Sequence, residues 1–138
     1  MKFLNALGLY DYEPARLALL STFQFDPDYF ERRVLRSPCL SRARRIAVFM
    51  DAREWRKLLR QEFAVRHLNR RYLVVPVDRA RAGVFHPKLN VLIAESGARV
   101  MCGSNNLTRA GCASNLELVS VVDVDEQEQL EGVERLMV

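Results

Sequence analysis

The hydrophobic residues of this chain occur in short runs, separated by polar segments that carry proline, glycine or helix-capping side chains. Continuous apolar runs rich in β-branched and aromatic residues are typical of buried strands. By this criterion, strands are predicted at residues 16–25, 45–50, 72–77, 84–94, 99–102 and 116–122. The fourth and fifth of these form a hairpin around Glu95-Ser96-Gly97, because that turn composition joins two adjacent strands.

Helices are predicted between the first three strands and after the last one. Asp26 followed by Pro27 is typical of a helix start, and this helix runs to about Arg36. Asp51 caps a second helix, and a third, acidic helix begins near Asp125. The second helix carries four large apolar side chains, Trp55, Leu58, Leu59 and Phe63. Strands that first alternate with helices and then follow one another directly predict an α/β fold, with a mixed β-sheet flanked by helices.

The chain of 138 residues has the length of one domain, and its 49% hydrophobic and 28% charged residues are typical of a globular protein. No repeat or Gly/Ser/Pro-rich linker divides it, so we expect a single domain over residues 1–138, with residues 1–14 as an irregular N-terminal arm. The longest apolar runs are four to five residues. A membrane span needs about 18–20, and no export signal is recognisable, so no membrane partner is expected.

Three cysteines, Cys39, Cys102 and Cys112, are expected to be reduced thiols, which predicts a cytoplasmic protein. Cys102 and Cys112 lie ten residues apart, and the chain contains only two histidines. Because this spacing does not match a zinc site, we expect neither a metal nor another cofactor.

Charge is distributed unevenly along the chain. Residues 32–81 contain fourteen Arg and one Lys against four acidic residues, a formal charge of +11, whereas residues 123–138 carry −5. A strongly basic segment is typical of proteins that bind polyanions, of which nucleic acid is the first candidate. A solvated, arginine-rich surface without a partner would give the same composition.

Candidate chemistry is concentrated in residues 85–118. His86 and Lys88 are separated by one residue, so on a strand both side chains point to the same side. Gly103-Ser104-Asn105-Asn106 follows the next predicted strand and suits a tight turn around an oxyanion. Glu117 lies on the strand after that, where a sheet can place it beside His86.

The order of His86-Pro87-Lys88, Gly103-Ser104-Asn105-Asn106 and Glu117 resembles the phospholipase D superfamily, whose signature is H-x-K, a G-S-x-N turn and then an acidic residue. The resemblance extends over residues 16–138 and implies a phospholipase D-like domain. One position departs from the pattern, because Ile93 stands where the superfamily motif has an Asp. Nuclease-like members and the tyrosyl-DNA phosphodiesterases are similar in lacking that Asp, so the resemblance favours this branch.

A phosphodiesterase needs a nucleophile, cations around the phosphoryl oxygens and an acid for the leaving oxygen. His86 is the candidate nucleophile, with Glu117 to orient it and Lys88 as the phosphate-binding cation. Asn106 and Ser104 are candidate hydrogen-bond donors to the phosphate. The resemblance implies a metal-independent nuclease that acts through a covalent phosphohistidine on nucleic acid, with DNA preferred over RNA.

The superfamily's site contains two His/Lys sets, and this chain supplies one. We therefore expect either a two-fold homodimer or pairing with a second phospholipase D-like half of a longer protein. The other histidine, His67, is interpreted as a surface residue at the C-terminal end of a helix.

Two other functions remain compatible with the sequence. One is a lipid phosphodiesterase or phosphatidyltransferase of the same superfamily, against which stand Ile93 and the absence of a membrane segment. The other is a non-catalytic nucleic-acid-binding module, which would bind in a salt-dependent manner without turnover.

Overall fold

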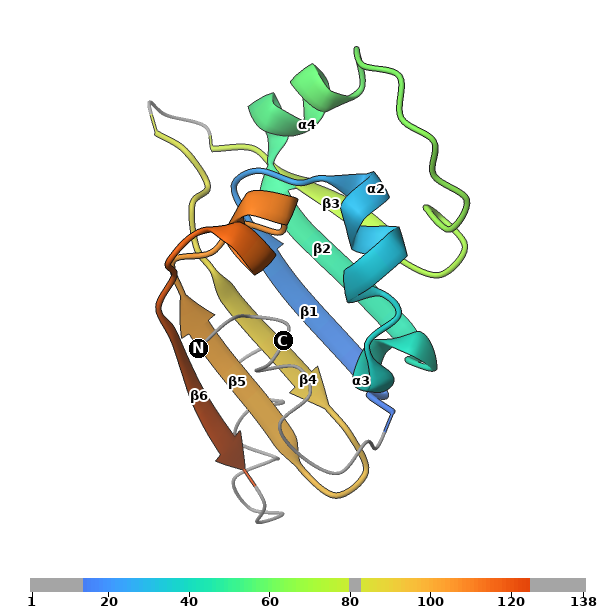
Figure 1. Ribbon diagram of the computed structural model, residues 1–138, viewed down its shortest axis with the longest axis vertical. Coiled ribbons are helices and arrows are strands. Elements are labelled where there is room, and N and C mark those ends of the chain that lie inside the picture. The colour runs from blue at the N-terminus through green and yellow to red at the C-terminus, as the bar shows by residue number, and fades with distance from the viewer. Residues whose placement is uncertain (1–13, 80–82, 125–138) are drawn as a thin grey trace.

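Six strands form one mixed sheet in a computed structural model of the chain, which describes residues 14–79 and 83–124 (Figure 1). The strands, in chain order, are β1 (Leu17–Thr22), β2 (Arg45–Asp51), β3 (Leu73–Val77), β4 (Leu89–Ile93), β5 (Ala98–Gly103) and β6 (Val119–Val124). Their spatial order is β3-β2-β1-β4-β5-β6. The first three run parallel, and β4 is antiparallel to β1 and begins an antiparallel series with β5 and β6. The predicted α/β class with a mixed sheet is confirmed.

Short helical segments follow β1, β2 and the turn after β5. They are α2 (Pro27–Tyr29), the π-helical turn η1 (Phe30–Val34), α3 (Pro38–Ser41), α4 (Ala52–Leu58) and the π-helical turn η2 (Ala110–Ser114). Asp26 caps α2 by accepting a hydrogen bond from the Tyr29 N–H at 2.9 Å, and Asp51 caps α4, as the sequence predicts. Figure 1 shows α2, α3 and η2 over the same face of the sheet.

The main core lies between this helical face and the sheet. Alternate residues of β1 and β2 point into it, because successive side chains of a strand point to opposite faces. Its fully or almost fully buried members include Ala18, Leu20, Val48, Met50, Phe30, Val34, Leu40, Tyr72 and Met101. A smaller cluster is formed by Val91, Ile93, Ala98 and Val124, with Leu17, Leu19 and Val100 packed against it.

Several predicted boundaries are wrong. The helix after Asp51 ends at Leu58, so Phe63 lies outside it, and Leu59 is 55% exposed instead of facing the core. His67 is exposed within the loop between α4 and β3, so it does not lie at a helix C-terminus. Trp55 is partly buried and packs against the main core.

Two predicted strands also begin later than expected. His86 and Lys88 lie in an extended segment before β4, which begins at Leu89, and Glu117 lies before β6. The N-terminal arm, up to residue 13, and the acidic helix from Asp125 lie outside the described residues. In the described part of the chain, no helix is both long and apolar enough to cross a membrane.

Candidate active site

The candidate site lies where several strand ends meet at one edge of the sheet (Figure 1). The carboxyl ends of β1, β2 and β5 lie at this edge together with the amino ends of β4 and β6, as the registers require. Two backbone hydrogen bonds close it, from the Gly103 N–H to the Lys88 carbonyl at 3.1 Å and from the Ser104 N–H to the Leu118 carbonyl at 3.0 Å. The topology therefore brings all three motif segments together.

His86 and Lys88 are in direct contact. The Lys88 Nζ lies 2.7 Å from Nδ1 and 3.1 Å from Nε2 of His86, and it also donates to the His86 carbonyl at 3.1 Å. Lys88 is 5% exposed, whereas His86 is exposed. Burial lowers the pKa of Lys88, and the negative charge of Glu117 acts in the opposite direction. An ammonium group that donates to a ring nitrogen requires a lone pair there, which is the form of imidazole that a nucleophile needs.

Phe23 supports this pair from the end of β1. Its ring centroid lies 4.8 Å from that of His86, and the Lys88 Nζ lies 5.9 Å from the Phe23 centroid. The second distance is within the range of a cation–π contact. Phe23 therefore limits the positions that both motif side chains can take, although no sequence motif assigns it to the site.

The backbone that follows β1 also holds Asn106. Its Oδ1 accepts hydrogen bonds from the backbone N–H groups of Phe23 and Gln24, both at 3.2 Å. The Thr22 Oγ1 lies 3.4 Å from this oxygen and accepts from the Leu107 N–H at 3.0 Å. Because the oxygen is used in this way, the amide nitrogen is the donor left for an anion, and it has no hydrogen bond within the described residues.

Ser104 and Glu117 form a second pair at the edge. The Ser104 hydroxyl donates to the Glu117 carboxylate through a short hydrogen bond, and its Oγ accepts from the Leu118 N–H at 3.2 Å. The Asn115 Nδ2 donates to Glu117 at 3.3 Å. No hydrogen bond joins Glu117 to His86 within the described residues, so its effect on the His86–Lys88 pair is the electrostatic one on Lys88.

Gly103 permits this close arrangement. A Cβ at this position would collide with the backbone carbonyl of Leu118, to which the neighbouring Ser104 N–H donates. The end of β5 thus needs glycine for close backbone approach.

Asp51 is a residue whose contribution to the site the sequence did not reveal. Its Oδ1 accepts from the Arg53 and Glu54 N–H groups at 2.9 and 3.3 Å, as a helix cap does. Its Oδ2 accepts from the N–H of Phe85, the residue before His86, at 2.8 Å. Burial acts to raise the pKa of this carboxyl group, but these three backbone hydrogen bonds outweigh it and leave the pKa below its ordinary value. Asp51 therefore anchors the segment that carries His86.

Within the described ranges, no three His, Cys, Asp or Glu side chains are grouped so that they could hold a metal ion. The site is instead composed of one imidazole, one buried ammonium group, one free amide donor and one carboxylate. Such a set matches an anionic substrate with several acceptor oxygens.

Comparison with known proteins places this geometry in a wider context. No family model matches the chain, and no curated protein matches its sequence. Among solved structures, NucT from Helicobacter pylori is 15% identical with a TM-score of 0.55, and the match covers 96% of this chain and 80% of NucT. Yeast tyrosyl-DNA phosphodiesterase is also 15% identical, with a TM-score of 0.53 over 84% of this chain and 27% of the enzyme. The chain has the phospholipase D fold.

This phospholipase D fold agrees with the resemblance that the sequence motif indicates. The chain spans about a quarter of the yeast enzyme's length. A mutant form of that enzyme gives the same result, with a TM-score of 0.54 over 86% of this chain and 27% of the enzyme. At 15% identity the likeness is one of fold, and the site residues rest on the contacts described above.

Proposed function

We propose that this protein is a phosphodiesterase of the phospholipase D type that cleaves nucleic acid, with DNA preferred over RNA, without a metal ion. The observation that carries the proposal is the contact of the buried Lys88 ammonium group with both ring nitrogens of His86 at the strand edge. A nucleophile beside a fixed cation matches the attack of an imidazole on an anionic phosphodiester.

The reaction has two steps in this proposal. A ring nitrogen of His86 forms a bond to phosphorus while the P–O bond to the leaving group breaks, giving a phosphohistidine. Lys88 and the amide nitrogen of Asn106 stabilise the charge on the phosphoryl oxygens, and the leaving oxygen takes a proton from a second histidine. That histidine then accepts a proton from water, which displaces His86 and releases the phosphomonoester.

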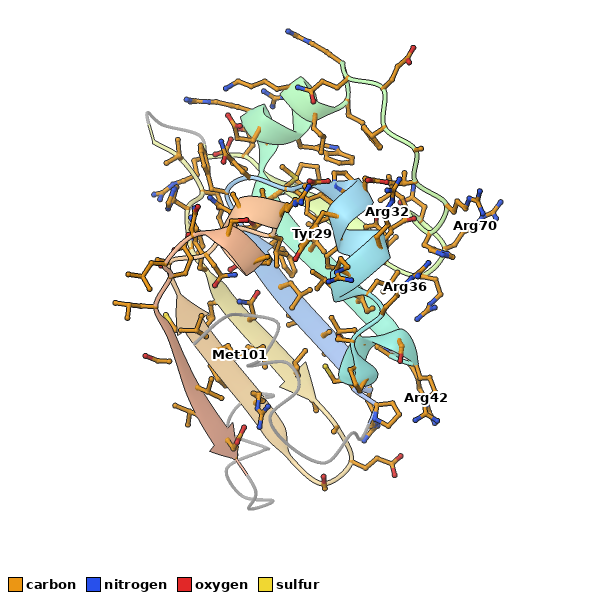
Figure 2. All side chains as sticks on the ribbon, viewed as in Figure 1. Tyr29, Arg32, Arg36, Arg42, Arg70 and Met101 are labelled. Atoms are coloured by element: carbon orange, nitrogen blue, oxygen red, sulfur yellow. The ribbon has the colours of Figure 1, made fainter. Side chains whose placement is uncertain are left out.

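Nucleic acid is the proposed substrate because of the basic side of the molecule. Figure 2 shows Arg32, Arg36 and Arg70 along the same side, and they come from two separate parts of the chain. All three are exposed. Such a surface attracts the phosphate backbone and makes binding depend on salt. The three cysteines form no disulfide among the described residues, and on the expectation of reduced thiols we further assign the protein to the cytoplasm.

The second histidine is proposed to come from a second copy of the chain. Leu116 is fully exposed and Leu118 is 81% exposed, and they flank Glu117 beside β6, the edge strand of the described sheet. Large apolar side chains exposed together mark an interaction surface. A two-fold contact here would bring two His86 sites toward one phosphate. A second phospholipase D-like half of a longer protein would serve the same purpose.

The mechanism is tested by hydrolysis of bis(4-nitrophenyl) phosphate and of DNA in the presence of EDTA. We expect turnover by the wild-type protein, none by His86→Ala, and nearly full turnover by the matched control His67→Ala. Activity that returns only with added Mg²⁺ would contradict the mechanism. DNA binding without turnover in any condition would instead identify a binding module.

The assembly is tested by light scattering. The wild-type protein should be a dimer, and Leu116→Glu combined with Leu118→Glu should give an inactive monomer. The control is Leu73→Glu on β3, at the opposite edge of the described sheet, where the side chain is 55% exposed. It should remain dimeric and active, whereas an active wild-type monomer would refute the dimer.

A further inference from the structure

A second region suited to a phosphate lies beside the candidate active site, between the α2–η1 segment and η2. A cavity of about 520 Å³ opens there, lined by residues of both segments. Figure 2 shows Tyr29 between these two helical segments. The volume lies within the range of about 300–1,000 Å³ usual for small-ligand sites.

This cavity is directly connected to the chain that holds Asn106. The Asp26 N–H donates to the Leu107 carbonyl at 3.0 Å, so the start of α2 is joined to the residue after Asn106. Asp26 and Arg109 both line the cavity, and Arg109 lies three residues beyond Asn106. The cavity and Asn106 therefore lie on adjoining segments of the chain.

The charges around the cavity leave two cations available. The acidic side chains already have partners, because Asp28 pairs with Arg32 at 2.9 Å and Asp26 caps α2. The side chains of Arg33 and Arg109 are exposed and have neither a hydrogen bond nor an ion pair in the part of the chain that the structure describes. Two arginines from different elements thus flank one cavity with no acidic side chain bound to either.

The Tyr29 hydroxyl adds an unused donor. It is buried and has no hydrogen-bond partner in the described structure. Burial raises its pKa, so the group keeps its proton, while the positive charges of Arg33 and Arg109 act on it in the opposite direction. Buried polar groups nearly always have partners, so an orphan donor at a cavity that two arginines also line indicates that a ligand group completes the site.

We propose that this cavity binds a backbone phosphate of the nucleic-acid strand next to the phosphate at His86, held by Arg33, Arg109 and the Tyr29 hydroxyl. The proposal rests on the proposed function for its ligand. Arginine suits this role because its planar group donates two parallel hydrogen bonds to phosphate. The site would fix the register of the strand, which a one-phosphate substrate does not need.

The test compares a one-phosphate substrate with a strand. The variant combines Arg33→Gln with Arg109→Gln. The control combines Arg44→Gln with Arg45→Gln, which removes equal charge at the amino end of β2, away from the strand ends that form the candidate site. For the Arg33/Arg109 variant, we expect the KM for a short single-stranded deoxyoligonucleotide, divided by the KM for bis(4-nitrophenyl) phosphate, to rise about tenfold or more. The control should keep the wild-type ratio. An unchanged ratio, or an equal rise in the control, would overturn the proposal.

Binding separates this inference from the catalytic proposal. Oligonucleotide affinity is measured by fluorescence anisotropy over a range of salt concentrations, and the Arg33/Arg109 variant should lose about 0.7 of salt slope per arginine. If the wild-type protein hydrolyses nothing, the catalytic proposal fails, while this loss of affinity and slope still supports the subsite. Tyr29→Phe should weaken binding without lowering the melting temperature, because it removes an unpartnered hydroxyl. Unchanged affinity in Tyr29→Phe would overturn the role of the hydroxyl.

Discussion

Replacing Asp51 with Asn tests whether the β2 carboxylate positions the catalytic segment. The substitution keeps the size of the side chain and replaces one of its two oxygens with an amide group, which cannot accept from an N–H. Asn caps helices nearly as well as Asp, so the α4 cap should survive. The hydrogen bond that is lost is the one from the Phe85 N–H at 2.8 Å.

The expected loss of stability follows from that bond. A hydrogen bond to a charged group contributes about 1.5–3 kcal/mol, so we expect the free energy of unfolding of Asp51→Asn to fall by about 2 kcal/mol. The effect on catalysis should exceed what partial unfolding explains, because Phe85 directly precedes His86. A displacement of about 1 Å at a reacting group can lower the rate about 10²-fold, and we expect a decrease in kcat approaching this size.

The assay uses kcat for bis(4-nitrophenyl) phosphate, corrected for the folded fraction measured by circular dichroism at the same temperature. The control is Asp78→Asn, which removes the exposed Arg56–Asp78 ion pair of 2.7 Å. Exposed pairs contribute about 0–1 kcal/mol, so this variant should match the wild-type protein in both measurements. If Asp51→Asn loses stability but keeps the kcat of its control, Asp51 is only a helix cap.

The dependence on pH gives an independent check. In the folded state the pKa of Asp51 is below its ordinary value of 3.8. The stability that the Asp51 carboxylate contributes is therefore complete at pH values above 3.8. It is lost as the pH falls through the lower, folded-state pKa. The difference in unfolding free energy between the wild-type protein and Asp51→Asn should therefore be constant near neutral pH and shrink in acid. A difference that grows in acid would show that the carboxylate is destabilising.

Two further predictions concern buried charged groups. Glu31 is 9% exposed and accepts hydrogen bonds from the N–H groups of Arg66 and His67 and from the Tyr72 hydroxyl. Glu31→Gln should therefore lower the free energy of unfolding, measured in urea, by about 2 kcal/mol. Equal stability of the two proteins would show that the loop before β3 does not depend on this carboxylate. Because burial lowers the pKa of Lys88 from 10.5, the pH profile of kcat/KM should fall on its basic side below that value, and a fall at or above it would contradict the role of the buried ammonium group.

Most strands were predictable because their apolar runs are uninterrupted and are bounded by proline, glycine or helix-capping residues. β2 begins at Arg45, where the sequence places it, and the hairpin between β4 and β5 surrounds the predicted turn. The errors lie beside the site. Pro87 lacks an N–H to donate to a ladder, which explains why β4 begins only at Leu89. The Leu118 N–H donates to the Ser104 side chain, so β6 begins after it.

The motif side chains could be selected from the sequence because their types and order carry the chemistry. Their supports could not, because each depends on a contact between distant segments. The sequence predicts Asp51 only as a helix cap, and only the folded chain reveals its hydrogen bond with the N–H of Phe85, 34 residues away. Likewise, Phe23 follows an apolar run like any core residue, and its place against His86 results from the pairing of β1 with β4.

Asn106 shows how motif and support combine in one side chain. Its amide nitrogen is the donor that the motif predicts for phosphate, while its oxygen holds the backbone of Phe23, whose ring packs against His86. The two roles require opposite ends of the same amide, which explains why Asn suits this position. Asp would keep the acceptor but place a negative charge beside the proposed phosphate position. Ser would be too short to reach both the Phe23 backbone and that phosphate. The position of His86, the proposed nucleophile, therefore depends on the residue that is also proposed to bind the phosphate.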